Sequence, residues 1–322
     1  MTVSVSRRTL LRAALSGAAS ASLSSLMAHS AIAKSLAGGL SSSREPLTIA
    51  RLSDRLVAIT GAGGNVVVSK TADGLLMVDG GLAERSAELL KRVADEFDGA
   101  RIKALFNTHW HWDHTGSNEA LAKQGASIVA HENTKLWLGA EIISRWEDRT
   151  YPPRPAKALP TDTFFYDSKH FELGGDTVEY GFLPQAHTDG DIYVFFPNHN
   201  VLVAGDVVTG GSYPILDYST NGWLGGMIRG LRLLLTKIDT DTRIVPGAGP
   251  LRTRADVQAQ LDMCLAMIGR IGGSYYKGQT WEEFSASNPT REFDAQWGNP
   301  DVFLRTAYEG AWQHVNEIRR FR

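Results

Sequence analysis

The most informative segment of the sequence is Thr108-His109-Trp110-His111-Trp112-Asp113-His114-Thr115-Gly116-Ser117-Asn118, in which three histidines and an aspartate lie within six residues. The apolar run 102–106 before it predicts a buried strand, so the cluster is expected at a strand's carboxyl end, where α/β folds place ligand sites. Side chains alternate in direction along an extended chain, so His109 and His111 are expected to face one metal ion. Asp113 and His114 lie beyond the turn and can face a second. Neutral imidazole and carboxylate suit divalent zinc or iron.

The composition narrows the choice of metal ligands and of partners. The chain has 322 residues, with 33 Lys+Arg against 35 Asp+Glu and a formal net charge of −2. It therefore lacks the excess of basic residues that is typical of nucleic-acid-binding proteins. Its single cysteine, Cys264, excludes a disulfide within the chain and a CxxC metal or redox pair. Histidines and carboxylates must therefore bind any metal. Cys264 lies in an apolar stretch of helical character and is expected to be a buried packing residue.

Strands and helices interleave in two halves of the chain, which predicts a single-domain α/β sandwich. Turns containing glycine separate short apolar or alternating runs, the pattern of strands joined as hairpins. The Pro-rich segment 151–160 is expected to be a loop. We expect strands at 47–60, 66–68, 75–79, 102–106, 127–130 and on to 208, and helices at 82–97, 118–123, from 226 and from 255 to the end.

Residues 1–33 have the character of an export signal and not of a folded segment. Arg7 and Arg8 precede a weakly apolar stretch that ends in the cleavage box at 31–33, a pattern that resembles a twin-arginine signal peptide. Residues 34–44 are small and polar and predict a flexible lead-in. We therefore expect a periplasmic protein that is exported in folded form and has no stable membrane anchor once the signal is removed.

Four motifs together resemble the metallo-β-lactamase-fold hydrolases over nearly the whole chain after residue 44. The pattern HxHxDH at 109–114 is similar to the signature of that superfamily. Residues 78–81 (VDGG), 186–191 (AHTDGD) and 203–206 (VAGD) resemble its early aspartate turn, its next histidine motif and its bridging aspartate. The resemblance implies a four-layer αβ/βα sandwich over residues 45–322, with C-terminal helices and with the metals at one edge between the sheets.

The resemblance also implies roles for single residues. The implied ligands of the first metal are His109, His111 and His187; those of the second are Asp113 and His114, with Asp206 bridging both. Asp79 would orient the histidine loop, because outer partners fix the tautomer and direction of metal-binding side chains.

One position departs from the family pattern. In residues 244–250 (IVPGAGP), Ala248 occupies the place of a histidine that normally binds the second metal. Alanine has no ligating atom, so the resemblance implies one tightly bound zinc and a second zinc that is weak or absent. We therefore expect closer to one than two metals per chain after dialysis.

The resemblance implies a zinc-dependent hydrolase whose metal-activated water attacks an ester, thioester, amide or lactam bond of a small-molecule substrate. Asp113 is the expected catalytic residue, because it can orient the nucleophile. Two alternatives stay open. One is a persulfide dioxygenase-like enzyme with a single Fe²⁺ on His109, His187 and Asp206, and the other is a degenerate protein that binds metal without turnover. The sequence names neither the substrate nor the oligomeric state.

Several aromatic residues have either a structural or a substrate-side interpretation. Trp110 and Trp112 occupy the variable positions of the histidine motif and can line a cleft or pack beneath the metal loop. Tyr213, Tyr218 and Trp223 lie in a Gly-rich segment, which can border a pocket or simply be structural.

Three further features have weaker signals. Arg229 is the nearest candidate to bind a substrate carboxylate, although its surroundings indicate a helix surface. His131, at a strand end, fits a hydrogen-bonded structural role. The segment 274–322 has helical periodicity and is expected to pack on the sandwich or to supply an oligomer contact.

Overall fold

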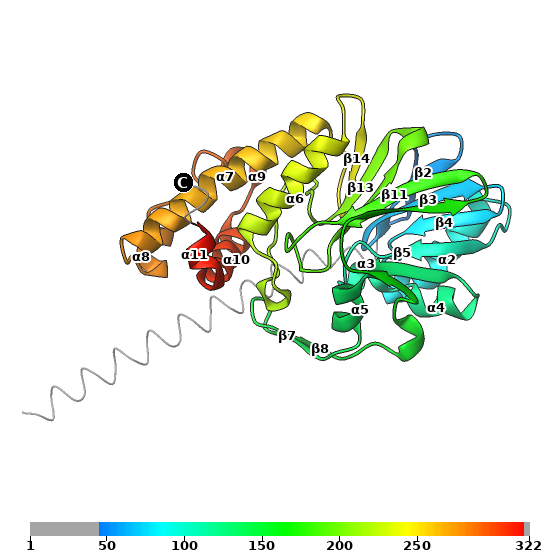
Figure 1. Ribbon diagram of the computed structural model, residues 1–322, viewed down its shortest axis with the longest axis horizontal. Helices are drawn as coiled ribbons and strands as arrows, with labels where there is room; N and C mark the ends of the chain where they lie inside the picture. Colours follow the sequence, from blue (N-terminus) through cyan, green and yellow to red (C-terminus); the bar gives the residue numbers. More distant parts are fainter. Residues whose placement is uncertain (1–44, 319–322) are drawn as a thin grey trace, which may run out of the picture.

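The computed structural model describes residues 45–318 as two β-sheets packed face to face, with helices on the outer face of each sheet (Figure 1). The four-layer α/β sandwich expected from the sequence is confirmed. The predicted signal peptide (1–33) and lead-in (34–44) lie outside the described residues, and both stay predictions.

Alternation along the strands separates the side chains that face the centre of the sandwich from those that face its outer helices. In β2 (Leu56–Ala62), Leu56 and Ala58 belong to the core between the sheets, whereas Val57 and Ile59 belong to the core under the helices. The same period of two recurs in both sheets, so each sheet is apolar on both faces and must be covered on both.

The first sheet has seven strands, and its outer face is covered by α2 (Ser86–Glu96) and α4 (Asn118–Lys123). In spatial order the strands are β1 (Thr48–Arg51), β2, β3 (Gly64–Thr71), β4 (Gly74–Val78), β5 (Ile102–Phe106), β6 (Ser127–His131) and β9 (Asp162–Phe164). The last four of these run parallel, so their carboxyl ends lie at the same edge. Asp79 follows β4 and the histidine cluster follows β5, which brings them together.

The second sheet has five strands, and its outer face is covered by α6 (Leu224–Lys237) and α7 (Arg254–Tyr276). In spatial order the strands are β10 (Ser168–Leu173), β11 (Asp176–Phe182), β12 (Ile192–Phe196), β13 (Val201–Gly205) and β14 (Arg243–Pro246). β13 and β14 are parallel, so Asp206 and Ala248, which follow them, lie at one edge. His187 lies in the connection between β11 and β12.

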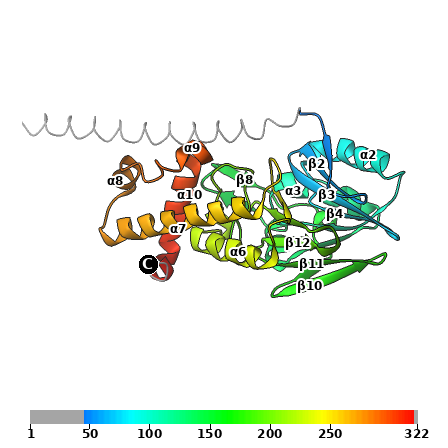
Figure 2. The ribbon, with the colours of Figure 1, turned by 90° about the horizontal axis from the view of Figure 1, so that it is seen from above.

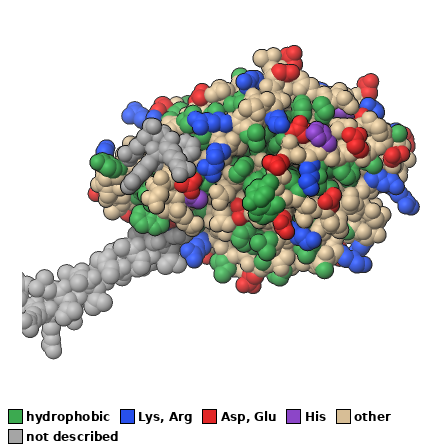
Figure 3. Space-filling view, in the orientation of Figure 1, with side chains coloured by type: hydrophobic (Ala, Val, Ile, Leu, Met, Phe, Trp, Pro, Cys, Tyr) green, Lys and Arg blue, Asp and Glu red, His purple; other side chains and the backbone are tan. Residues whose placement is uncertain are grey.

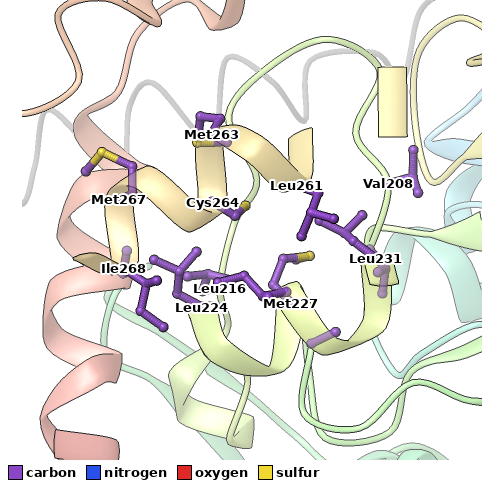
Figure 4. Packing of buried hydrophobic residues seen from close by; sticks show 14 of the residues in the cluster. Val208, Leu216, Leu224, Met227, Leu231, Leu261, Met263, Cys264, Met267 and Ile268 are labelled. Atoms are coloured by element: carbon purple, nitrogen blue, oxygen red, sulfur yellow. The ribbon is translucent and has the colours of Figure 1, made fainter. Parts of the chain in front are cut away.

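α6 and α7 pack through one apolar cluster, in which Met227 and Leu231 of α6 lie close to Leu261 and Cys264 of α7 (Figure 4). Cys264 is fully buried there, as predicted. Further helices extend this side of the molecule beyond the sheets (Figure 2). They are α8 (Trp281–Ala286), α9 (Asp294–Trp297), α10 (Asp301–Ala311), η6 (Trp312–His314) and α11 (Val315–Ile318).

Several short elements differ from the sequence expectations. The helix expected over 82–97 begins with a 3₁₀ turn, η2 (Ala83–Arg85), before α2. The loop expected over 151–160 contains the last residue of a strand and a 3₁₀ turn. Elements this short carry too little periodicity to predict. Those without a clear sequence signal are α3 (Trp112–Thr115), α5 (Glu132–Leu138), β7 (Ile142–Ser144), β8 (Arg149–Tyr151), η3 (Ala156–Ala158), η4 (Pro197–His199) and η5 (Tyr218–Thr220).

The surface carries charges of both signs. On the face shown in Figure 3, acidic and basic side chains are interspersed, and no broad area of one sign stands out. Within residues 45–318, no helix combines the length and the apolar composition that a membrane span requires.

Candidate metal centre

Four side chains from three segments converge where the edges of the two sheets meet. His109 and His111 follow β5, His187 lies between β11 and β12, and Asp206 follows β13. One ligating atom from each side chain lies within 4.8 Å of one from every other. The sandwich thus brings together residues that are as much as 97 positions apart in the sequence, 109 to 206, in a group that can hold a metal ion.

The facing nitrogens of His111 and His187 are close enough to share a proton or to bind one metal ion. His111 Nδ1 lies 3.0 Å from His187 Nε2. The opposite nitrogens are occupied, because His187 Nδ1 donates to the carbonyl of Ile215 at 2.8 Å and His111 Nε2 lies 3.2 Å from Asp217 Oδ2. In neutral imidazoles the two facing nitrogens would then both carry lone pairs, and a metal ion stabilises such an arrangement.

His109 offers a third nitrogen to the same group. Its Nδ1 lies 3.0 Å from the Thr108 hydroxyl, which donates to Asp79 Oδ2 at 2.8 Å and is therefore an acceptor for the imidazole. His109 Nε2 is buried and has no hydrogen-bond partner among the described residues, an arrangement that a metal ion would complete. Burial and the neighbouring His114 ring hold the pKa of His109 well below its usual value, which keeps that nitrogen free to bind.

Asp206 also faces a second group. Its Oδ2 lies 3.5 Å from His187 Nε2 and 3.9 Å from His109 Nε2, while its Oδ1 lies 3.5 Å from His114 Nε2. His114 Nε2 is buried without a hydrogen-bond partner and lies 3.7 Å from Asp113 Oδ2. The two oxygens of Asp206 are thus directed at separate sets of histidines, the geometry of a bridging carboxylate.

The carboxylates form the open side of the centre. The side chains of Asp113 and Asp206 are 31% and 29% exposed, whereas those of His109 and His187 are each 1% exposed. A water molecule or substrate can therefore reach the centre past the carboxylates. Burial alone would raise the pKa of Asp206, but the nearby imidazoles, His114 foremost, hold it well below the usual value.

Asp79 lies behind the histidines, at the position that the resemblance implies. Its carboxylate accepts the backbone N–H and the hydroxyl of Thr108 and lies 2.8 Å from His114 Nδ1. The residue is buried and has a φ of 61°, in the left-handed region. Such strained backbone persists only where the surroundings hold it, and it is common at functional sites.

The loop after β14 brings no side-chain ligand to the second group. A Cβ on Gly247 would come within 1.7 Å of Asp206 Oδ1, so only glycine fits against that carboxylate. Ala248, the next residue, is exposed and lines an open hollow of about 580 Å³ that includes Gly210, Ser212 and Gln296. Asp113, His114 and the shared Asp206 are the donors on that side, but among residues 45–318 they do not converge as closely as His109, His111, His187 and Asp206 do. A second metal there stays a prediction.

Asp217 is a buried residue of the centre that the sequence does not reveal. Besides the contact with His111, its carboxylate accepts from the indole N–H of Trp146 at 2.9 Å and from the Thr220 hydroxyl. Burial alone would raise its pKa, but the hydrogen bond with His111 and its other donors lower it to about 2. The local signal is only an Asx turn to the Ser219 N–H, which is common at helix starts and does not indicate a metal centre.

The aromatic candidates divide between the centre and the core. Trp110 is buried, and its indole donates to the Thr220 hydroxyl at 3.1 Å, so it packs beneath the loop. Trp112 is partly exposed. Of the two interpretations left open for Tyr213, Tyr218 and Trp223, the contacts support the structural one: the two tyrosines bond to Asp294 and Glu309, and Trp223 stacks on His314 at 4.0 Å. They pack against the C-terminal helices, which the Gly-rich composition alone does not indicate.

Arg229 and His131 have structural surroundings. The Arg229 guanidinium, on α6, lies 3.7 Å from the Glu317 carboxylate and 5.3 Å from the centre of the Trp223 ring. His131 caps α5, accepting from the Asn133 N–H and bonding to the Phe165 carbonyl at 2.9 Å. The structural interpretation of His131 is thereby supported.

The chain belongs to the metallo-beta-lactamase superfamily, whose family model matches residues 59–270. Among curated relatives, Metallo-beta-lactamase IND-1 of Chryseobacterium indologenes is 25% identical over 162 residues, which is 50% of this chain and 62% of the relative. A hydroxyacylglutathione hydrolase of Thermosynechococcus vestitus is 31% identical over 120 residues, 35% of this chain and 37% of the relative. The chain thus spans less than two thirds of the length of either relative.

Solved structures support the same fold. A metallo-beta-lactamase from Pontibacter korlensis superposes with a TM-score of 0.54 at 21% identity, covering 68% of this chain and 99% of that chain. The sec-alkylsulfatase Pisa1 from Pseudomonas sp. gives a TM-score of 0.66 at 15% identity, covering 82% of this chain and 50% of that chain. At these identities the likeness shows the fold alone.

Proposed function

We propose that the protein is a zinc-dependent hydrolase of a small molecule with an ester, thioester, amide or lactam bond. One observation carries the proposal: the free nitrogens of His109, His111 and His187 meet one oxygen of Asp206, while each imidazole's other nitrogen is already hydrogen-bonded. Prearranged nitrogen and oxygen donors of this kind suit zinc, and outer partners that fix each tautomer are typical of metal centres.

The chain's own residues have distinct roles in this proposal. His109, His111, His187 and Asp206 would hold zinc, which when bound lowers the pKa of water and polarises a carbonyl. Asp113 is exposed at the open side and would accept a hydrogen bond from the attacking water and orient it. Cys264 is not a nucleophile in this proposal, because it is buried between α6 and α7 and burial raises the pKa of its thiol.

The geometry also bears on the two alternatives. A mononuclear iron dioxygenase needs only His109, His187 and Asp206, yet His111 Nδ1 is directed into the same group. The third imidazole favours zinc over an iron held by two histidines and one carboxylate, and zinc can expand to five ligands to take a water during hydrolysis. The named activities of the relatives, a β-lactamase and a hydroxyacylglutathione hydrolase, also favour hydrolysis. A metal-binding protein without turnover is the remaining alternative.

The test is a set of turnover assays on protein reconstituted with either zinc or iron. The panel contains a β-lactam, a thioester, an aryl ester and a persulfide with oxygen uptake as its readout. We expect hydrolysis with zinc that Asp113→Asn lowers by about 10²-fold or more, while Asp294→Asn, which alters a carboxylate bonded to Tyr213 and outside the candidate ligands, leaves it unchanged. Oxygen consumption with iron would favour the dioxygenase, and retained metal without any turnover would favour the binding protein.

We also propose that the protein is exported through the twin-arginine route and acts in the periplasm. The proposal rests on Arg7, Arg8 and the cleavage box at 31–33. Replacing both arginines with lysine is expected to keep the protein in the cytoplasm in a fractionation experiment. Unchanged export of this variant would contradict the proposal.

A further inference from the structure

The β7–β8 hairpin is attached to the metal centre through its turn. The indole N–H of Trp146 donates to Asp217 Oδ1 at 2.9 Å, and the other oxygen of Asp217 bonds to His111. The backbone N–H of Arg145 also donates to the Ser219 hydroxyl at 3.3 Å. These contacts fix the turn of the hairpin beside Asp217, which bonds to the candidate ligand His111.

Two arginines of this region pack over the aromatic residue between two candidate ligands. Trp112 lies between His111 and Asp113 in the sequence. The guanidinium of Arg154 lies 4.9 Å from the centre of the Trp112 ring. That of Arg149 lies 4.4 Å from the centre of the Tyr151 ring and 5.7 Å from that of Trp112. The aromatic faces attract both cations and hold them in place.

Neither guanidinium has a close counter-charge. Among residues 45–318, no carboxylate oxygen lies within 4.0 Å of Arg149 or Arg154, although many other arginines of the described chain have such a partner. Of the nearby acidic residues, Glu147 accepts from the Tyr151 hydroxyl and Glu119 pairs with Lys123 at 2.7 Å. Burial lowers the pKa of Arg154, and the attraction of Glu119, which lies beyond 4.0 Å, partly offsets this effect. Asp113 is directed at His114. Two fixed positive charges are thus available to an external anion.

We propose that Arg149 and Arg154 form an oxyanion-binding subsite beside the metal centre, and that the ligand bears a carboxylate or a sulfo group a short distance from the atom that approaches the metal. The guanidinium fork matches both groups by paired N–H donors. That this ligand is a substrate rests on the proposed function; the binding itself does not.

Binding of metal-directed thiols tests the proposal without requiring turnover. Isothermal titration of the zinc-loaded full chain would compare ω-mercaptocarboxylates of two to six carbons with mercaptoalcohols of the same length. Mercaptosulfonates form a third arm that distinguishes a sulfo group from a carboxylate. We expect the best anionic thiol to bind at least 10-fold more tightly than its alcohol, and we expect sodium chloride to reduce this difference.

Variants then assign the preference to the two arginines. In Arg149→Gln/Arg154→Gln the anionic preference should be lost while the alcohols bind as before. Arg149→Lys/Arg154→Lys should retain part of the anionic preference, because lysine keeps the positive charge but lacks the paired N–H donors of the guanidinium. The matched control is Arg92→Gln/Arg101→Gln, two exposed arginines on another side of the first sheet, which should retain all of it.

The outcomes separate this subsite from the proposed function. Equal binding of anionic and neutral thiols by the wild-type protein, or a preference that survives Arg149→Gln/Arg154→Gln, would overturn the subsite. If the preference is present and depends on these arginines but no substrate of the hydrolase panel is turned over, the subsite stands and the hydrolase proposal fails.

Discussion

At the scale of single residues, Asp217 determines which nitrogen His111 presents to the centre. Its Oδ2 lies 3.2 Å from His111 Nε2, which directs Nδ1 toward His187. Asp217→Asn can donate where the carboxylate accepts, so the imidazole loses its fixed tautomer. We expect zinc affinity to fall about 10- to 100-fold, measured by competition with a chromogenic chelator. Asp294→Asn, which alters a carboxylate bonded to Tyr213, should bind zinc like the wild type; equal affinities in all three proteins would contradict this role.

Asp217 should also make the metal-free protein sensitive to acid. Its pKa in the folded protein is about 2, against an ordinary value of 3.8. A lowered carboxylate pKa stabilises the fold above the ordinary value, and this contribution is lost as the pH falls toward 2. Between pH 5 and pH 3 the linkage amounts to about 1 kcal/mol. Denaturant unfolding at pH 5 and at pH 3 measures this loss. The free energy of unfolding of the wild type should fall by about 1 kcal/mol more than that of Asp217→Asn, and equal losses in the two proteins would contradict this role.

The contrast between His109 and Asp217 shows how far a sequence can predict a site. One short motif contains His109, His111, Asp113 and His114. Its composition and the alternating direction of side chains along a strand are enough to indicate a metal centre. Asp217 reaches His111 across 106 positions, and its neighbours form an ordinary turn. Its role depends on the path of the chain between β13 and α6, which no local pattern predicts.

At the scale of secondary structure, long or strongly apolar elements could be predicted and short ones could not. β5 and α4 have the predicted bounds, 102–106 and 118–123. The β7–β8 hairpin has only three residues in each strand and therefore no detectable period. It is nevertheless the element that brings Trp146 to Asp217, beside the candidate ligand His111. No pattern in the sequence predicts this contact.

The packing of α6 on α7 predicts a stability difference along one helix. Leu231 is fully buried in the cluster between these helices, whereas its neighbour Arg232 is exposed. Leu231→Ala leaves a cavity and should lower the free energy of unfolding by about 2–5 kcal/mol. Arg232→Ala should change it by less than about 0.5 kcal/mol. Urea unfolding monitored by circular dichroism makes the comparison, and a similar effect of the two substitutions would show that the interface is not well packed.

At the scale of the whole molecule, the candidate ligands come from both sheets. His109 and His111 follow a strand of the first sheet, and His187 and Asp206 follow strands of the second. A metal ion bound by all four would connect the two halves of the sandwich, and binding to the folded state alone stabilises that state.

Removal of the metal should therefore lower the melting temperature. With free zinc at 100 times its dissociation constant the stabilisation is about 2.7 kcal/mol, which corresponds to a shift of about 4–5 °C for a chain of this size. Differential scanning fluorimetry with zinc and with EDTA measures the shift. His109→Ala/His187→Ala should melt at the same temperature under both conditions, and a wild-type protein that is indifferent to EDTA would refute the stabilising role.

The most direct measurement is the zinc content of the purified protein after dialysis against metal-free buffer, determined by elemental analysis beside His109→Ala/His187→Ala. We expect close to one zinc per wild-type chain, because His109, His111, His187 and Asp206 converge as one group, whereas Asp113, His114 and Asp206 lack the histidine that Ala248 replaces. We expect none above background in the double variant. Wild-type protein as empty as the variant would contradict the metal centre itself, and two tightly retained zinc ions would contradict the weakness assigned to the second group.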